Sequence, residues 1–267
     1  MKRISSRDNP SFKTLRLWSV DTAARRTARI AILEGIHLAD AWLASGGMAR
    51  EIVTGQSALD HPEVVDLLAR AARCEPPPVH YALDDALFAS LSQLAQGVRL
   101  LTIVDRPTPS APLRIVRDSV VLDRVQDPGN VGSILRSAAA AGIVDVYLSR
   151  ECAGGWSTKV LRGGMGAHFH LRIFEDCDLT ALKNRADVPW IATSPHADAS
   201  LYDADLRGDV AWVFGHEGQG LDAAFVDVAS TVRIPQPGHG ESLNVAASAA
   251  ICFFEQVRQR KGRQSGS

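Results

Sequence analysis

The sequence predicts an α/β protein whose second half is built on a mostly parallel sheet with helices on both faces. The first observation is an alternation of short apolar runs with helical segments, which is typical of that architecture. In the second half we expect strands over residues 120–122, 144–148, 190–192, 210–214 and 232–234. Ligands of such sheets bind outside the carboxyl ends of the strands. We therefore expect a functional site in the loops that follow these runs.

A proline-rich stretch is the second observation, because it divides the chain in two. Residues 106–112 hold three prolines in seven positions, which predicts an extended linker. We therefore expect an N-terminal domain over residues 1–105, a linker over 106–116 and a larger domain over 117–267.

The N-terminal part shows the same alternation on a smaller scale. Residues 29–45 have apolar residues near helical spacing and stop at Gly46-Gly47, which predicts a helix. Two further helices and three strands are expected over residues 62–73, 84–94, 51–54, 79–81 and 98–104. Together they predict a small α/β unit.

Composition and charge are those of a globular protein in water. Hydrophobic residues make up 46% of the chain and charged residues 22%. No apolar run approaches the roughly 20 residues that span a bilayer, and the N-terminus lacks the apolar core of a secretion signal. We therefore expect a cytoplasmic protein that does not contact a membrane. Residues 1–30 hold eight Lys and Arg against two acidic residues, and the tail from Arg258 is also basic. Such ends suit phosphate contacts, although solvated termini are the alternative.

The cysteines and histidines do not predict a metal site. The four cysteines are Cys74, Cys152, Cys177 and Cys252. They lack the spacing of a metal finger, and we expect them to be buried small apolar residues. Residues 167–171 alternate as in a strand, which would place His168 and His170 exposed on one face.

A turn followed by a helix comes after the first strand of the second half. Residues 127–129 predict the turn, Asn130 is a plausible N-cap, and the helix should stop at Gly142. A helix N-terminus in this place can bind an anion. The glycine spacing differs from a dinucleotide fingerprint and there is no P-loop lysine, so a simply capped helix is the alternative. Arg136 in this helix is either a surface charge or a fork for phosphate.

Two glycine- and proline-rich loops near the C-terminus predict a pocket built mainly from backbone, since glycine lets the main chain approach a ligand and proline stiffens it. The first loop spans residues 215–221, and its Glu217 could fasten the loop by accepting backbone N–H groups. The second spans residues 233–246 and leads into a long helix with an apolar face. Ser242 could cap that helix, and Asn244 could bind the substrate or the first motif.

In this order, the three loops resemble the three motifs of the SpoU/TrmH family of SPOUT RNA methyltransferases. The run from Ile234-Pro235 to Ser242-Leu243-Asn244 is the most specific part of the resemblance. Further similarity lies in residues 9–15, 34–38, 96–97 and 157–167, so that it covers nearly the whole chain. These enzymes transfer a methyl group from S-adenosylmethionine to a ribose 2′-hydroxyl.

The resemblance implies a fold, a cofactor and partners. The second domain would be a SPOUT domain tied into a trefoil knot, and the first a ribosomal-protein-like domain that binds RNA. The protein would be a homodimer packed through the knotted domain. It would use S-adenosylmethionine without a metal, and its substrate would be ribosomal RNA as first choice and transfer RNA as second.

The resemblance also implies site residues. The catalytic residues would be Asn130, Arg136, Glu217, Ser242 and Asn244. The cofactor would contact Thr193, Gly215, Glu217, Gly218, Gly220, Ile234, Pro235, Ser242, Leu243 and Asn244. We expect Leu243 to cover the adenine and Glu217 to shape the loop. Because a guanidinium is almost never neutral in a protein, Arg136 should hold a phosphate or polarise the hydroxyl rather than act as a base.

Two other interpretations stay open at this point. A non-catalytic RNA- or ribosome-binding factor could keep the fold, but we would then expect Asn130, Arg136 or Asn244 to be missing, and all three are present. A nucleotide-dependent oxidoreductase is disfavoured by the absent G-x-G-x-x-G pattern and by the position of the glycine loops near the C-terminus.

Overall fold

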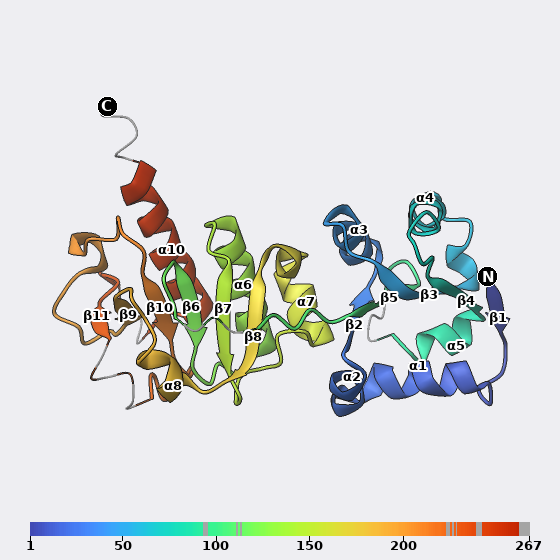
Figure 1. Cartoon of the computed structure of the whole chain (residues 1–267), viewed down its shortest axis with the longest axis horizontal. Helices are drawn as coiled ribbons and strands as arrows, with labels where there is room; N and C mark the ends of the chain where they lie inside the picture. The colour runs from blue at the N-terminus through green and yellow to red at the C-terminus, as the bar shows by residue number, and fades with distance from the viewer. Residues whose placement is uncertain are drawn as a thin grey trace. The chain divides into compact units, whose positions relative to one another are not determined.

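The computed structural model describes residues 1–92, 96–110, 112, 114–222, 225, 227, 229–238 and 242–261. The chain forms two compact units (Figure 1). The first unit consists of Met1–Pro107 and Trp156–Phe169, and the second of Thr108–Gly155 and His170–Ser267. Residues 106–110 and 112 form neither helix nor strand. The segment Trp156–Phe169 follows the linker in sequence, yet its helix α7 (Thr158–Gly164) packs against strand β2 (Ile30–Glu34) of the first unit.

The first unit is a five-stranded mixed sheet with helices on both faces. Its remaining elements are β1 (Lys2–Ile4), α1 (Pro10–Val20), α2 (Thr22–Ala28), β2 (Ile30–Glu34), α3 (Ile36–Ala44), β3 (Ala49–Gly55), α4 (Pro62–Ala71), β4 (Val79–Leu83), α5 (Asp85–Ala89) and β5 (Leu100–Asp105). The strand order is β1-β4-β3-β5-β2. Strand β4 is parallel to β1 and β3, whereas β5 is antiparallel to β3 and β2. Helices α1, α2 and α5 lie on one side of this sheet, and α3 and α4 on the other (Figure 1).

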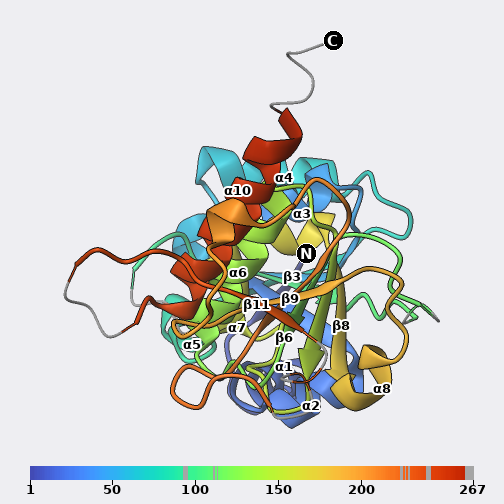
Figure 2. The same ribbon diagram turned by 90° about the vertical axis from the view of Figure 1, so that its left-hand side faces the viewer.

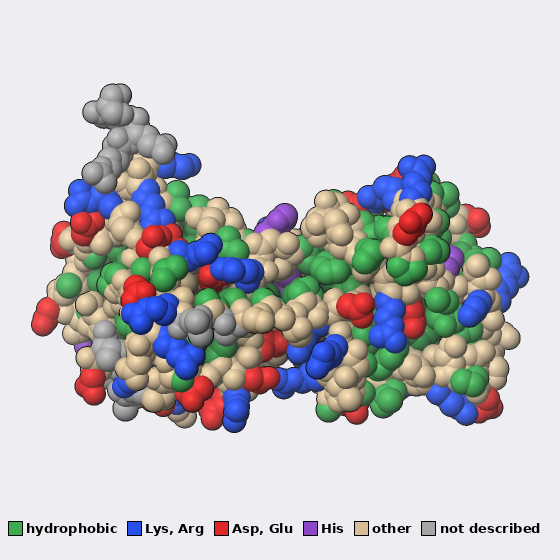
Figure 3. All heavy atoms as spheres, in the orientation of Figure 1, with side chains coloured by type: hydrophobic (Ala, Val, Ile, Leu, Met, Phe, Trp, Pro, Cys, Tyr) green, Lys and Arg blue, Asp and Glu red, His purple; other side chains and the backbone are tan. Residues whose placement is uncertain are grey.

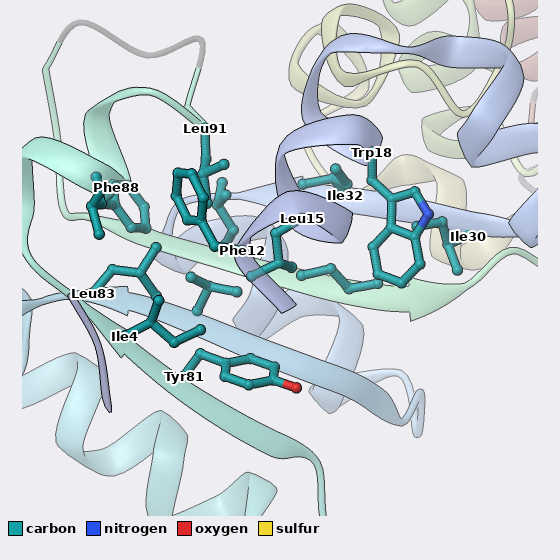
Figure 4. Close-up of a cluster of buried hydrophobic side chains, with 14 residues drawn as sticks. Ile4, Phe12, Leu15, Trp18, Ile30, Ile32, Tyr81, Leu83, Phe88 and Leu91 are labelled. Atoms are coloured by element: carbon teal, nitrogen blue, oxygen red, sulfur yellow. The ribbon is translucent and has the colours of Figure 1, made fainter. Parts of the chain in front are cut away.

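An apolar core fills the space between α1 and the first sheet (Figure 4). Phe12, Leu15 and Trp18 lie at helical spacing on α1, and all three are buried. The helix begins where the side chain of Asn9 accepts two backbone N–H groups of the first turn, at 2.9 and 3.4 Å. Pro10 then occupies the first helical position, where its missing N–H costs nothing.

The prediction of one helix over residues 29–45 is wrong in its first part. Residues Ile30–Glu34 form β2, whose first four residues are all buried, and α3 begins only at Ile36. Arg29 and Gly35 both have positive φ, 53° and 85°, and so interrupt the backbone at each end of the strand. A run that is apolar at every position fits a buried strand as well as a helix, which is why spacing alone extended the helix too far.

The second unit is a six-stranded sheet in which every pair of neighbours is parallel. Its elements are β6 (Ser119–Leu122), α6 (Pro128–Ala140), β7 (Asp145–Ser149), β8 (Arg172–Cys177), α8 (Leu179–Lys183), β9 (Trp190–Thr193), β10 (Ala211–Phe214), β11 (Ser230–Val232) and α10 (Val245–Lys261). The strand order is β11-β9-β10-β6-β7-β8. The predicted mostly parallel α/β sheet is therefore confirmed, with β8 as an additional strand. Chain order reverses between β6 and β10, which brings the loops after these two strands together at the carboxyl edge.

The two central strands of the second sheet, β6 and β10, are buried at every position because helices cover both faces. Trp212 and Phe214 of β10 contact Phe253 of α10, with ring centroids 6.5 and 5.7 Å apart. Val213, which lies between them, joins an apolar cluster with Leu182 of α8. Successive residues of a strand point to opposite faces, so the two clusters lie on the two sides of the sheet. Figure 2 shows α10 and α6 side by side. Among the described residues, no helix is both long and apolar enough to cross a membrane.

The prediction of a strand with two exposed histidines over residues 167–171 is wrong. Ala167–His170 form a short 3-10 helix, and the extended strand begins only at β8. His168 is 1% exposed and lies edge-on to Trp156, with ring centroids 5.4 Å apart. Met165, the C-cap of α7, and Gly166 have φ of 49° and 86°, so a left-handed turn leads directly into this 3-10 helix.

The four cysteines are free thiols, and the expected burial is complete in only one of them. Cys252 is buried, whereas Cys74, Cys152 and Cys177 are half-buried. Burial still raises the pKa of Cys177 to about 11, so its thiolate is scarce at neutral pH.

Candidate functional site

A cavity of about 390 Å³ lies where the loops after β9, β10 and β11 meet. Its lining includes eight of the ten residues predicted to bind the cofactor, namely Thr193, Gly215, Glu217, Gly220, Ile234, Ser242, Leu243 and Asn244. Gly218 and Pro235, the other two, are not part of the lining. Ser194, His216, Gln236 and Ser248 line the cavity as well and were not predicted. His239, Gly240 and Glu241 of the third motif lie outside the described residues.

The loop after β10 is a tight turn that requires glycine at two positions. The backbone of His216 and Gly220 exchanges two hydrogen bonds, of 3.0 and 2.9 Å. Gly220 has φ of 70°, which side chains disfavour. A Cβ on Gly215 would lie 2.4 Å from the carbonyl carbon and oxygen of Gly220. The turn therefore closes only because the main chain at Gly215 carries no side chain.

Two side chains that sequence reasoning did not single out hold this turn in place. The Nδ1 atom of His216 accepts the backbone N–H groups of Gly218 and Gln219, at 2.9 and 3.2 Å. Arg124 reaches across from the loop after β6 and donates to the Gln219 side chain at 3.2 Å. Its other donors form a bidentate pair with Asp123, which is 2% exposed. His216 lies within the predicted loop but was given no role there, and Arg124 lies outside the motifs because its contact follows from the adjacency of β6 and β10.

A chain of side-chain hydrogen bonds links the three predicted motifs. The Glu217 carboxylate accepts the Nδ2–H of Asn130 at 3.0 Å and the backbone N–H groups of Gln126 and Asp127 at 3.3 and 3.2 Å. Asn130 in turn accepts, through Oδ1, the Nδ2–H of Asn244 at 2.9 Å. Glu217, Asn130 and Asn244, here called the relay, thus bring together segments up to 114 residues apart.

The electrostatics of the relay keep Glu217 ionised. Partial burial by itself raises the pKa of its carboxyl, but the hydrogen bonds from Asn130 and from backbone N–H groups outweigh burial and lower the pKa below the ordinary value. A carboxylate that is ionised and already accepts three hydrogen bonds is a weak base at neutral pH. This chemistry suits a residue that shapes the loop.

The two predicted helix caps are each displaced to a neighbouring polar residue. Asp127, not Asn130, caps α6 by accepting the backbone N–H of Asn130 at 2.8 Å. Asn244, not Ser242, caps α10 by accepting the N–H groups of Ala246 and Ala247 at 2.9 and 3.2 Å. Because the caps are made elsewhere, the side chain of Asn130 is free of the capping role and its two ends serve the relay.

Arg136 takes no part in the hydrogen bonds of the relay. It is exposed on α6, and it is not among the residues that line the cavity. Within the described ranges, no hydrogen bond or ion pair holds its guanidinium. Its five donors are therefore available to a phosphate or another external acceptor.

The far end of α10 is anchored by a partly buried polar network, which sequence reasoning also missed. Trp212 Nε1–H donates to Gln256 at 2.9 Å, and Gln256 donates to Asp118 at 2.8 Å. Arg260 completes the network with a forked ion pair to Asp118. Gln256 is 2% exposed, so its hydrogen bonds fix α10 against β10 and with it the position of the Asn244 cap.

Comparison of the chain with known proteins identifies it as an RNA methyltransferase. The chain belongs to the SpoU rRNA Methylase family, whose sequence profile matches residues 118–254. The match includes all three motifs and confirms the family resemblance seen in the sequence.

Relatives extend over both units. The chain is 33% identical over 265 residues to an uncharacterised tRNA/rRNA methyltransferase of Synechocystis, which covers 96% of this chain and 94% of the relative. It is 29% identical over 259 residues to the 23S rRNA (guanosine(2553)-2′-O)-methyltransferase RlmP of Bacillus subtilis, and the match covers 95% of this chain and 98% of RlmP. The structure of an AdoMet-bound rRNA methyltransferase from Sinorhizobium meliloti superposes with a TM-score of 0.83 at 25% identity, covering 96% and 97%.

Proposed function

We propose that the protein is an S-adenosylmethionine-dependent methyltransferase that acts on a ribose 2′-hydroxyl of ribosomal RNA. The observation that carries the proposal is the relay, which joins the three motifs beside a backbone-lined cavity. The family assignment and the names of the relatives support it. Transfer RNA is the second choice of substrate.

The residues present fit the cofactor. The cavity of about 390 Å³ is within the size range of ligand pockets. Gly215 and Gly220 let the main chain approach a ligand closely, and Leu243, 37% exposed, offers an apolar surface for the adenine. Thr193, Ile234 and the other predicted contacts that line the cavity would hold the remaining groups. When bound, S-adenosylmethionine supplies an activated methyl group, so that the protein has mainly to orient the reactants.

Some of the chain's residues would hold the loops of the site together, and others would orient the RNA substrate. Glu217 and Asn130 fix the first two loops to each other, and Asn244 ties the third loop and α10 to them. Arg136 would hold an RNA phosphate or donate a hydrogen bond to the ribose 2′-hydroxyl. Since Glu217 is ionised and fully engaged, the hydroxyl proton would pass to a phosphate or to water. Ser242 lines the cavity and would contact the bound reactants.

Further expectations from the sequence belong to the same proposal. We infer that the second unit is a knotted SPOUT domain that forms a homodimer, that the protein needs no metal, and that it works in the cytoplasm. The first unit would be a ribosomal-protein-like domain that binds RNA. On the face that Figure 3 shows, Lys and Arg side chains occur over both units and are interspersed with Asp and Glu side chains.

Methyl transfer to RNA tests the proposal directly. Labelled S-adenosylmethionine would be incubated with total ribosomal and transfer RNA, and the nucleosides analysed by mass spectrometry. We expect a 2′-O-methylated nucleoside in ribosomal RNA that is lost in Arg136→Ala and at least tenfold reduced in Arg136→Lys, because lysine lacks the planar fork. Cofactor binding by both variants is the control. Failure to bind S-adenosylhomocysteine or to methylate any RNA, including assembling ribosomal particles, would contradict the proposal.

A further inference from the structure

A second cavity, of about 570 Å³, lies entirely within the first unit and has no role in the site described above. Three segments form its walls. Ser57 and His61 follow β3, Phe88 and Ala89 belong to α5, and Arg99 precedes β5. Phe88 is 3% exposed and is anchored in the core cluster of Figure 4, so this wall is rigid.

The charges around this cavity cancel. Arg99 forms an ion pair of 2.6 Å with Asp85 and donates to the Ser57 hydroxyl at 3.0 Å. The same Asp85 accepts the backbone N–H and the hydroxyl of Ser57, both at 3.1 Å. A free arginine would attract phosphate, but one already neutralised by a carboxylate offers no net charge to an anion. The cavity therefore favours a neutral ligand with hydrogen-bonding edges.

A basic side chain lies just beyond α5. Arg16, an exposed residue of α1, donates to the carbonyl oxygen of Ser90 at the end of α5. A ligand with a neutral ring and an attached phosphate would thus find its ring partners in the cavity and a cation nearby. Proteins recognise single-stranded RNA in this manner, with unpaired bases splayed into pockets and phosphates outside.

We propose that this cavity receives an unpaired nucleobase of the RNA substrate, with Phe88 and Ala89 against its rings and Arg99 and Ser57 at its edge. The inference rests on the proposed function, because that function makes RNA the ligand. It adds a recognition site in the first unit, separate in sequence and in structure from the cavity beside the relay.

The test fills the cavity at a position where the chain offers a matched control. Ala89 lines the cavity and Ala86 does not, although both are exposed residues of α5. Full-length Ala89→Trp and Ala86→Trp would be titrated with single-stranded RNA nonamers of A, C and U by fluorescence anisotropy. An abasic ribose-phosphate nonamer is the probe for backbone binding alone.

We expect Ala89→Trp to weaken binding of at least one base-containing nonamer about tenfold, which is the loss of about one base contact. Binding of the abasic nonamer should stay unchanged, and Ala86→Trp should match the wild type with every probe. Equal affinities of the two variants for all nonamers would overturn the inference. So would a wild-type chain that binds the abasic probe as tightly as the others.

A measurement on the unaltered chain covers the case that Ala89→Trp does not fold. Nonamers containing 4-thiouridine would be photo-crosslinked and the attached peptides sequenced. Crosslinks to the peptides of Ser57, Phe88 or Arg99 support the inference, and crosslinks confined to other peptides refute it. These readouts need no methyl transfer, so an inactive protein that still binds bases here would disprove the proposed function and leave the base site standing.

Discussion

One methyl group added at Gly215 should open the loop that closes the cofactor cavity. The Cβ of Gly215→Ala would lie 2.4 Å from the Gly220 carbonyl and 2.6 Å from the Leu221 nitrogen, all of them backbone atoms. Restoring ordinary contact requires a shift of about 1 Å, which stretches the two His216–Gly220 hydrogen bonds beyond their useful range. Overpacking costs about 1–3 kcal/mol and each hydrogen bond about 1 kcal/mol. We therefore expect the free energy of unfolding to fall by about 3 kcal/mol.

Urea denaturation and S-adenosylhomocysteine titration would measure the effect of Gly215→Ala. Gly208→Ala is the control in the same unit, because its Cβ would meet no atom within 4 Å. For stability alone, Gly218→Ala is the control within the loop, since the nearest atoms lie 3.8 Å away. Both controls should stay within about 0.5 kcal/mol of the wild type, whereas Gly215→Ala should bind the ligand at least tenfold more weakly. If Gly215→Ala matched Gly208→Ala in both measurements, the close approach of the two backbone segments would not govern the loop.

Three further predictions concern the relay and the anchor of α10. Asn130→Asp replaces a donor by a second carboxylate, so NMR titration should show a raised pKa for Glu217. In the wild type that pKa is lowered, so Glu217 stabilises the fold above about pH 4.3 and loses this contribution as the pH falls through the folded-state pKa. Identical acid unfolding curves for the wild type and Asn130→Asp would contradict this stabilising role of Glu217. Asn244→Asp keeps the cap but not the donor to Asn130, and should retain thermal stability while methyl transfer falls. Asn244→Ala should also lose about 1 kcal/mol; equal activity of Asn244→Asp and wild type would exclude the relay from catalysis. Gln256→Leu leaves the buried Nε1–H of Trp212 without its acceptor and should cost about 2 kcal/mol in urea denaturation, and a neutral effect would mean that the anchor is dispensable.

The cavity could be predicted from the sequence because its walls are loops that follow apolar strands. Runs such as residues 210–214 fix where a parallel strand ends, and Gly215 and Gly220 then mark a turn that few other residues permit. The position of Glu217 between them followed from the motif. Its contact with Asn130 did not, because it depends on the pairing of β10 with β6, which are separated by more than eighty residues.

The missed features depend on small differences in distance or on long-range packing. Asp127 and Asn130 are both good capping residues, and only the backbone geometry decides that Asp127 accepts the N–H. Arg124 has no motif, since its role comes from a loop on the neighbouring strand. Residues 30–33 satisfy helical spacing and a buried strand equally well, so tertiary packing made the choice.

The segment Trp156–Phe169 has a consequence for how this protein can be divided or recombined. The first unit is not formed by one continuous stretch of sequence, because it includes α7, which follows the linker. A fragment that ends at residue 105 would lose the Arg162–Glu34 ion pair of 3.6 Å and the T-shaped contact between the rings of Phe169 and Trp42. A fragment that begins at residue 108 would carry fourteen residues whose packing partners are gone. Chimeras between relatives should therefore exchange residues 1–107 and 156–169 together, because the two segments form one structural unit.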